Sequence, residues 1–303
     1  MKEKNIELFK KYLKERDLSD RTIKNYLSDI LHFRKWLTDL YQEERDLEST
    51  EQDDIKAYRQ ELLDIKRQKA TSINRRLQSI KIYFKFLNII LNSVNDPAEK
   101  IKFVRRGKPN KPQSINRTEA HLLLNAAKQS RYGLARRNYA IIQLMLQAGL
   151  RVGEICRLQI RDIKINERSG SVRVIDSKGI KEREVPLNSS VRNALKEYLK
   201  EKKDVKETDY LFTSKRRTGI TVRSLQLVID TIYKRSKIER IKVSAHTLRH
   251  TFAINYLHSN PNQLSELALL MGHDSINTML IYTKASKEKL GLAVEKTEVN
   301  IYG

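Results

Sequence analysis

The chain of 303 residues contains a single cysteine, Cys156. One cysteine forms no internal disulfide, which is typical of proteins that fold in a reducing cytoplasm. No stretch reaches the roughly 18 consecutive apolar residues of a transmembrane helix. The first twenty residues are charged throughout and lack the apolar segment of a secretory signal. We therefore expect a cytoplasmic protein without a membrane segment. Cys156 lies within an apolar helical pattern, so we expect its thiol to be buried.

Acidic residues are much fewer than basic ones. The 37 Asp and Glu residues stand against 60 Lys and Arg, which gives a formal net charge of +23 at pH 7. The excess is spread over the first 110 residues and the remainder, so it does not come from a basic tail alone. Such a charge favours a polyanionic partner, of which nucleic acid is the commonest. Apolar residues make up 39% of the chain, which is enough for the cores of two domains.

Apolar residues in the first hundred positions recur every three or four residues, which predicts helices. The clearest patterns cover residues 18–37, where Ser19 and Asp20 are candidate caps, and residues 71–90. Shorter patterns near residues 6–13 and 53–63 complete a four-helix domain, which we place at residues 1–104.

A basic segment containing two prolines and a glycine follows, and we interpret residues 105–113 as a linker. The second predicted domain covers residues 114–303 and is mostly helical. Valines at 172, 174 and 185 predict two or three short strands, with a turn near residues 177–181. The first expected helix of this domain starts at Asn116 or Thr118 and ends near residue 127. Further helices are expected at residues 136–149, 150–158, 191–203, 222–236, 247–259, 264–271 and 275–282. The fold class is therefore mainly α, with two domains and a small antiparallel β-sheet in the second.

Four of the six histidines lie between His246 and His273, and Tyr282 follows nine residues later. His246 and His250 have the i, i+4 spacing of zinc ligands on a helix. A zinc hydrolase of the H-E-x-x-H type needs glutamate next to the first histidine, where this chain has Thr247. Arg249 would also oppose a dication. We therefore expect no metal and no cofactor.

The same segment suits the binding of an anion. Arg249 follows His246 by three residues, so both side chains project from about the same helix face. A guanidinium holds two phosphate oxygens at once, and histidines exchange protons near neutral pH. A second arginine, Arg151, follows a glycine turn, and Glu154 stands one turn later, where it can orient Arg151. Lys178 supplies an ammonium group in the predicted strand turn, and Tyr282 is a candidate nucleophile.

Four segments carry these residues in order: "GLRVGEI", "SKGIKEREVPL", "HTLRHTFA" and "MGHDSINTMLIYTK". Together they resemble the tyrosine recombinase (phage integrase) family, particularly its Xer-like and transposon-borne members. The segment "SINRRLQSIKIYFKFL" resembles the core-binding domain of that family, so the resemblance extends over nearly the whole chain. It implies a SAM-like N-terminal domain and a catalytic domain that together form a C-shaped clamp on DNA.

The resemblance also assigns roles. Arg151 and Arg249 become the paired phosphate-binding arginines, and Glu154 supports them. The remaining catalytic residues would be Lys178, His246, His273 and Tyr282, while His250 would either pack the helix or support the catalytic residues from behind. Residues expected to contact DNA are Asn74, Arg75, Arg76, Lys81, Lys181 and Arg223.

The implied reaction needs neither metal nor ATP. Tyr282 attacks a phosphodiester, forms a 3′-phosphotyrosyl ester and releases a 5′-hydroxyl, with His246 as base and Lys178 as acid. Two rounds of exchange pass through a Holliday junction and involve a homotetramer on two double-stranded sites with inverted core-site repeats. The C-terminal tail, with Leu290, Leu292 and Val294, would dock on a neighbouring protomer.

Two other interpretations remain open on the sequence alone. One is an enzyme like the type IB topoisomerases, which relaxes supercoiled DNA. The other is a sequence-specific DNA-binding regulator without catalysis. For a recombinase, the task remains open between resolution of dimers or cointegrates and integration or excision of a mobile element, with or without a partner recombinase or accessory protein.

Overall fold

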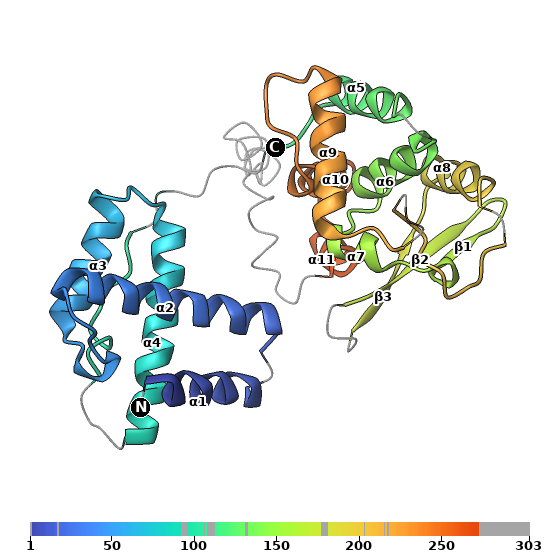
Figure 1. Ribbon diagram of the computed structural model, residues 1–303. Coiled ribbons are helices and arrows are strands. Elements are labelled where there is room, and N and C mark those ends of the chain that lie inside the picture. Colours follow the sequence, from blue (N-terminus) through green and yellow to red (C-terminus); the bar gives the residue numbers. More distant parts are fainter. Residues whose placement is uncertain are drawn as a thin grey trace, which may run out of the picture. The chain divides into compact units, whose positions relative to one another are not determined.

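The computed structural model divides the chain into two compact units, Met1–Pro109 and Asn110–Gly303 (Figure 1). It describes residues 2–16, 18–91, 96–105, 107, 113–130, 133–176, 181–202, 204–214, 216 and 218–272. Within these ranges, no helix has the length and apolar character needed to cross a bilayer. The linker at residues 105–113 and the clamp around DNA stay predictions.

The regular secondary structure in the described part of the N-terminal unit consists of helices. Its elements are α1 (Lys2–Glu15), α2 (Asp20–Tyr41), the 3-10 helix η1 (Leu47–Ser49), α3 (Gln52–Asp64) and α4 (Ala70–Leu91). Helix α2 begins at the predicted cap, where the Ser19 side chain accepts a hydrogen bond from the Thr22 amide. The apolar stripes of α2 and α4 face each other, and α4 also contacts α1 and α3. Because Phe33 and Leu77 are fully buried in this core, each contributes roughly 1.5–3 kcal/mol by leaving water.

The C-terminal unit combines helices with one small sheet. Its elements are α5 (Arg117–Lys128), α6 (Ala135–Gln147), α7 (Val152–Arg157), η2 (Ile160–Asp162), β1 (Ile163–Ile165), β2 (Gly170–Ile175), β3 (Glu182–Pro186), α8 (Ser189–Leu199), α9 (Val222–Ser236), α10 (Ala245–Ser259) and α11 (Leu264–Met271). The strands pair antiparallel in the order β1-β2-β3, and Val172 lies opposite Val185 with both side chains buried. This confirms the predicted fold class.

Helix α6 forms the centre of this unit. Every residue from Ala140 to Leu146 is buried, because α5, α8 and α10 all pack against it. A helix that is apolar on nearly all sides needs such a position. In Figure 1 the three strands lie together at one edge of the unit, next to α7, and β3 contacts α11. The predicted arginines Arg151 and Arg249 donate to carbonyls that follow α6 and that end α11.

Two expected helices differ from the structure or fall outside it. The helix predicted over residues 191–203 ends at Leu199. Beyond it the chain turns, and the Lys202 ammonium donates a hydrogen bond to the Tyr210 carbonyl. The helix predicted over residues 275–282 lies outside the described residues.

Candidate active site

The turn after α6 sets the position of the first arginine. Gly149 has a φ of 64°, in the left-handed region that glycine adopts without strain. A Cβ placed on Gly149 would come within 2.2 Å of the Phe252 ring on α10. Glycine therefore serves both the backbone conformation and the close packing at this point. The turn brings Arg151 to the N-cap of α7.

Glu154 holds Arg151 through two contacts. Its carboxylate accepts a hydrogen bond from the Arg151 backbone amide at 2.7 Å and another from Arg151 Nη1 at 2.9 Å. The Glu154 side chain is only 3% exposed, whereas that of Arg151 is 42% exposed. A buried carboxylate thus orients a guanidinium that still reaches solvent.

Arg183 on β3 is a residue that the sequence analysis missed. Its Nη1 and Nη2 donate to the two carboxylate oxygens of Glu154 at 3.0 and 2.9 Å. Burial alone would raise the pKa of Glu154, but the hydrogen bonds and charge of Arg183, together with the two hydrogen bonds from Arg151, hold that pKa below its usual range. Strand periodicity offered a signal, since Arg183 stands two positions before the buried Val185 and so shares its face.

The second predicted arginine, Arg249, lies on the buried face of α10 and is 6% exposed. Its guanidinium donates to the carbonyls of Gly149 and Met271. Gly149 and Arg249 are therefore linked directly, although 100 residues separate them in the sequence.

Three arginines converge on the end of α11. Arg183 Nε donates to the Leu270 carbonyl at 2.8 Å, Arg249 donates to that of Met271, and Arg151 Nη2 donates to that of Gly272 at 2.8 Å. Each of three successive carbonyls thus accepts from a different guanidinium. The helix ends at Met271, its C-cap Gly272 has a φ of 60°, and His273 follows directly in the sequence.

The two histidines of the H-x-x-R-H segment differ in exposure. His246, in the first turn of α10, is exposed, and its ring centroid lies 6.4 Å from that of His250. His250 is half-buried, and burial lowers its pKa, with further lowering by the charges of His246 and Arg249. A lowered pKa keeps His250 neutral near pH 7. His246 lies three residues before Arg249 on the same helix, and its role in proton transfer stays a prediction.

Three predicted catalytic residues, Lys178, His273 and Tyr282, lie outside the described residues. Next to Lys178 in the sequence, the Asp176 amide donates a hydrogen bond to the Lys181 carbonyl at 2.9 Å. The structure thus brings together Arg151, Glu154 and Arg249, with His246 three residues before Arg249 on α10, and the roles assigned to all these residues stay predictions.

The residues of α4 that were predicted to contact DNA have partners within their own unit. The sequence pattern places Asn74 on an exposed face, but the structure corrects this: Asn74 is 6% exposed, and its amide bonds to the backbone N–H and carbonyl of Val104. Lys81 donates to the carbonyls of Ala98 and Glu99.

The two neighbouring arginines of α4 are also paired. Arg75 forms an ion pair with the buried Asp29, and Arg76 lies 3.4 Å from the Tyr58 hydroxyl. The side chain of Arg75 nevertheless remains 47% exposed. Arg223 is exposed in the first turn of α9. DNA contacts by all of these residues stay predictions.

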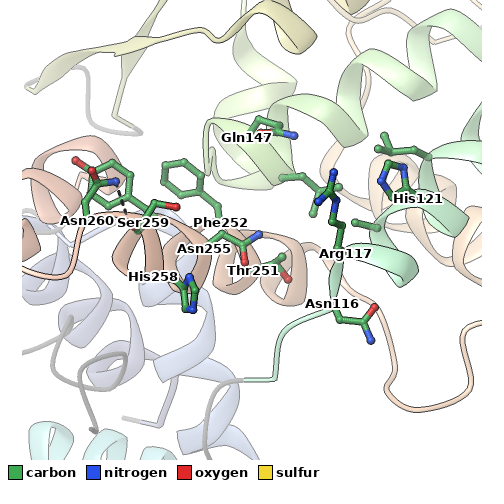
Figure 2. A pocket seen from close by; sticks show the side chains of 14 residues that line it. Asn116, Arg117, His121, Gln147, Thr251, Phe252, Asn255, His258, Ser259 and Asn260 are labelled. Atoms are coloured by element: carbon green, nitrogen blue, oxygen red, sulfur yellow. Dashed lines mark hydrogen bonds between the residues drawn. The ribbon is translucent and has the colours of Figure 1, made fainter. Parts of the chain in front are cut away.

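A separate hollow of about 910 Å³ lies between α5, the end of α6 and the C-terminal half of α10 (Figure 2). Its walls include Arg117, His121, Gln147, Phe252, Asn255 and His258. None of the three arginines lines it. Phe252 lies between the hollow and the arginine site, because it lines the hollow and also packs on Gly149.

Comparison with known families settles the relationship that the motifs indicate. Residues 113–289 match the model of the phage integrase family, and residues 6–88 match that of the phage integrase N-terminal SAM-like domain. The chain belongs to the phage integrase family of tyrosine recombinases. Tyrosine recombinase XerC of Pediococcus pentosaceus is 31% identical over 294 residues, which cover 94% of each chain.

Solved structures agree with this assignment. The crystal structure of XerA recombinase is 27% identical, with a TM-score of 0.53 over 99% of this chain and 100% of that one. XerH site-specific recombinase, bound to its difH substrate before cleavage, is 22% identical and shares the fold, with a TM-score of 0.74 over 97% of this chain and 85% of XerH. This tyrosine recombinase is thus an enzyme that binds DNA and performs site-specific recombination through strand cleavage by a tyrosine. The predicted function and enzyme class are confirmed.

Proposed function

We propose that this recombinase cleaves DNA by attack of Tyr282 on a phosphodiester bound between Arg151 and Arg249. The observation that carries the proposal is the convergence of these two guanidiniums, which donate to the adjacent carbonyls of Gly272 and Met271. The positive charges of Arg151 and Arg249, which are distant in the sequence, therefore lie together at the end of α11. A phosphodiester bound there would meet donors that are already oriented.

The proposed chemistry uses that charge. Attack on phosphorus builds negative charge on a pentavalent transition state, and fixed guanidiniums offset it without reorganising. The Tyr282 oxygen forms a bond to phosphorus while the bond from phosphorus to the 5′ oxygen breaks. Because a tyrosine hydroxyl has a pKa of about 10, its proton must leave during attack, and His246 accepts it. Lys178 supplies a proton to the departing 5′ oxygen, and His273 adds a hydrogen bond to the phosphate.

We propose a core-site task of the kind that the Xer relatives perform. Support comes from the match to XerC, which covers 94% of both chains and so includes both units. The substrate would be a duplex with inverted core-site repeats, and the biological outcome would be resolution of dimers or cointegrates, or excision of an element. A 3′-phosphotyrosyl ester conserves the energy of the broken bond, so rejoining needs no ATP. The enzyme would act in the cytoplasm, where that DNA lies.

We further propose a homotetramer whose members exchange their C-terminal tails. The hollow in Figure 2 suits the tail of a neighbouring copy, because its walls combine apolar and polar side chains. The tail likewise places Leu290, Leu292 and Val294 among charged residues. Replacing Leu290 and Leu292 with serine should convert DNA-bound tetramers into smaller complexes in analytical ultracentrifugation. Unchanged tetramers would contradict the tail exchange.

Covalent capture tests the central proposal. The protein is incubated with sheared genomic DNA of its source organism in EDTA and denatured in SDS, and the protein-linked DNA is sequenced. We expect one site to be enriched, with its 3′ end attached to the peptide that contains Tyr282. Tyr282→Phe should retain DNA binding in a mobility-shift assay and form no adduct. Adducts that persist in Tyr282→Phe would show that another residue attacks.

A further inference from the structure

We propose that Arg183 is a positioning residue for strand cleavage, which fixes Arg151 through Glu154 and fixes the end of α11 at the same time. The proposal rests on the proposed function in one respect, namely that Arg151 holds the phosphate and Tyr282 attacks it. Arg183 itself is 15% exposed along its side chain. It is therefore placed to hold other residues rather than to meet DNA.

The first contact of Arg183 fixes the carboxylate. Both terminal nitrogens donate to the two oxygens of Glu154, at 3.0 and 2.9 Å. Glu154 in turn accepts from the backbone and side chain of Arg151. Its two oxygens thus accept four hydrogen bonds, and the plane of the carboxylate is set by the guanidinium of Arg183. A bidentate pair of this kind restrains orientation as well as distance.

The second contact fixes the segment that leads to the nucleophile. Arg183 Nε donates to the Leu270 carbonyl at 2.8 Å. A Cβ on Gly272 would come within 2.7 Å of Arg183 Nη1, so the backbone of the turn lies directly against the guanidinium. One planar group therefore spans Glu154 and the last turn of α11. Any shift of Arg183 displaces both the partner of Arg151 and the residues immediately before His273.

Lysine cannot replace this arginine. An ammonium group is a single donor centre and lacks the planar arrangement that serves a carboxylate and a carbonyl together. Arg183→Lys keeps the charge but loses the bidentate geometry. Because a misplacement of about 1 Å at a reacting centre costs about 100-fold in rate, we expect a large effect on cleavage and a small one on DNA binding.

The test compares Arg183→Lys with Arg192→Lys. Arg192 on α8 donates to the Leu187 carbonyl at 2.8 Å, which is none of the groups that Arg151, Arg183 and Arg249 bind, so it controls for loss of a structural guanidinium. The probe is a nicked duplex of the captured sequence. Arg183→Lys should lower the rate of adduct formation at saturating DNA about 10- to 100-fold, with the Kd within about 3-fold. Arg192→Lys should leave both unchanged. Rates are normalised to folded protein, measured by circular dichroism.

Two further readouts separate positioning from folding. Hydrogen exchange of the peptide at residues 264–272 should rise in Arg183→Lys without DNA and stay constant in Arg192→Lys. The double variant Arg183→Lys, Glu154→Gln should cleave within about 3-fold of the slower single variant, because both changes act on Arg151 by one route. Multiplied losses, or a normal rate per folded Arg183→Lys molecule, would overturn the proposal. If Tyr282→Phe still forms adducts, the proposed function fails instead.

Discussion

Replacing Gly149 with alanine tests how the turn after α6 holds the arginine site together. The substitution has two separable costs. Alanine must adopt a φ of 64°, and its Cβ would overlap the Phe252 ring, whose nearest atom lies 2.2 Å from the added carbon. Phe252 is 8% exposed, so the ring has little room to move away.

The structure offers a matched control for the first cost. Gly133 has a φ of 68°, and a Cβ placed there meets nothing within 4 Å. Gly133→Ala therefore incurs the left-handed strain alone, about 1–2 kcal/mol. Gly149→Ala adds the cost of overpacking, about 1–3 kcal/mol, so we expect a total loss of about 2–5 kcal/mol. Cleavage should also fall, because the Gly149 carbonyl accepts a hydrogen bond from Arg249.

Urea denaturation followed by two probes measures the difference. Far-UV circular dichroism reports both units, whereas the single tryptophan, Trp36, lies on α2 and reports the N-terminal unit. The tryptophan transition should stay in place in both variants, while the transition of the C-terminal unit moves to lower urea. If Gly149→Ala and Gly133→Ala lose the same free energy of unfolding within about 0.5 kcal/mol, the contact with the Phe252 ring costs nothing, contrary to this prediction.

Three further predictions concern buried polar groups. The folded protein holds the pKa of Glu154 below its usual range. This carboxylate therefore stabilises the fold at pH values above the unfolded pKa of about 4.3, and the stabilisation is lost as the pH falls through the folded pKa. Acidification from pH 7 to 3.5 should therefore destabilise Glu154→Gln less than wild type in thermal unfolding. Asp29 is 2% exposed and accepts two side-chain hydrogen bonds, so Asp29→Ala should lower the free energy of unfolding by about 1–3 kcal/mol, measured by Trp36 fluorescence. Replacement of the exposed Asp53 by alanine should lower it by less than about 0.5 kcal/mol. Burial raises the pKa of Cys156 to about 11, so iodoacetamide at pH 7.5 should alkylate the native thiol far more slowly than the thiol in urea, and equal rates would contradict its burial.

Local patterns in the sequence were sufficient to predict much of the fold. The apolar spacing of residues 18–37 predicts α2, and Ile23, Ile30 and Phe33 are all buried. Alternating valines predict the strands, and Val172 and Val185 indeed face each other across the sheet. Both predictions succeed for the same reason. Residues two positions apart in a strand, or three or four positions apart in a helix, lie on the same face.

Contacts between residues that are distant in the sequence could not be predicted from local patterns. Asn74 carries a polar side chain on a predicted exposed face, yet its amide pairs with the backbone of Val104, 30 residues away. Arg183 lies within a motif that the sequence analysis quoted, but its partners Glu154 and Leu270 come from two other elements. Periodicity indicates that a side chain faces inward, and only the tertiary fold supplies its partner.

The buried glutamate explains how three arginines assemble before DNA arrives. Guanidiniums brought together in a partly buried site repel one another, and each would lose water without compensation. Glu154 supplies one full negative charge to two of them, and the last carbonyls of α11 supply the partial negative charge of a helix C-terminus to all three. Among the contacts that the structure describes, one carboxylate serves three cations, which leaves an excess of positive charge, and Arg151 still reaches solvent. In the proposed mechanism that residual charge is what binds the phosphodiester, and the carbonyls that balance it belong to the turn directly before His273. Phosphate binding and the placement of the C-terminal catalytic residues are then linked through the same three side chains.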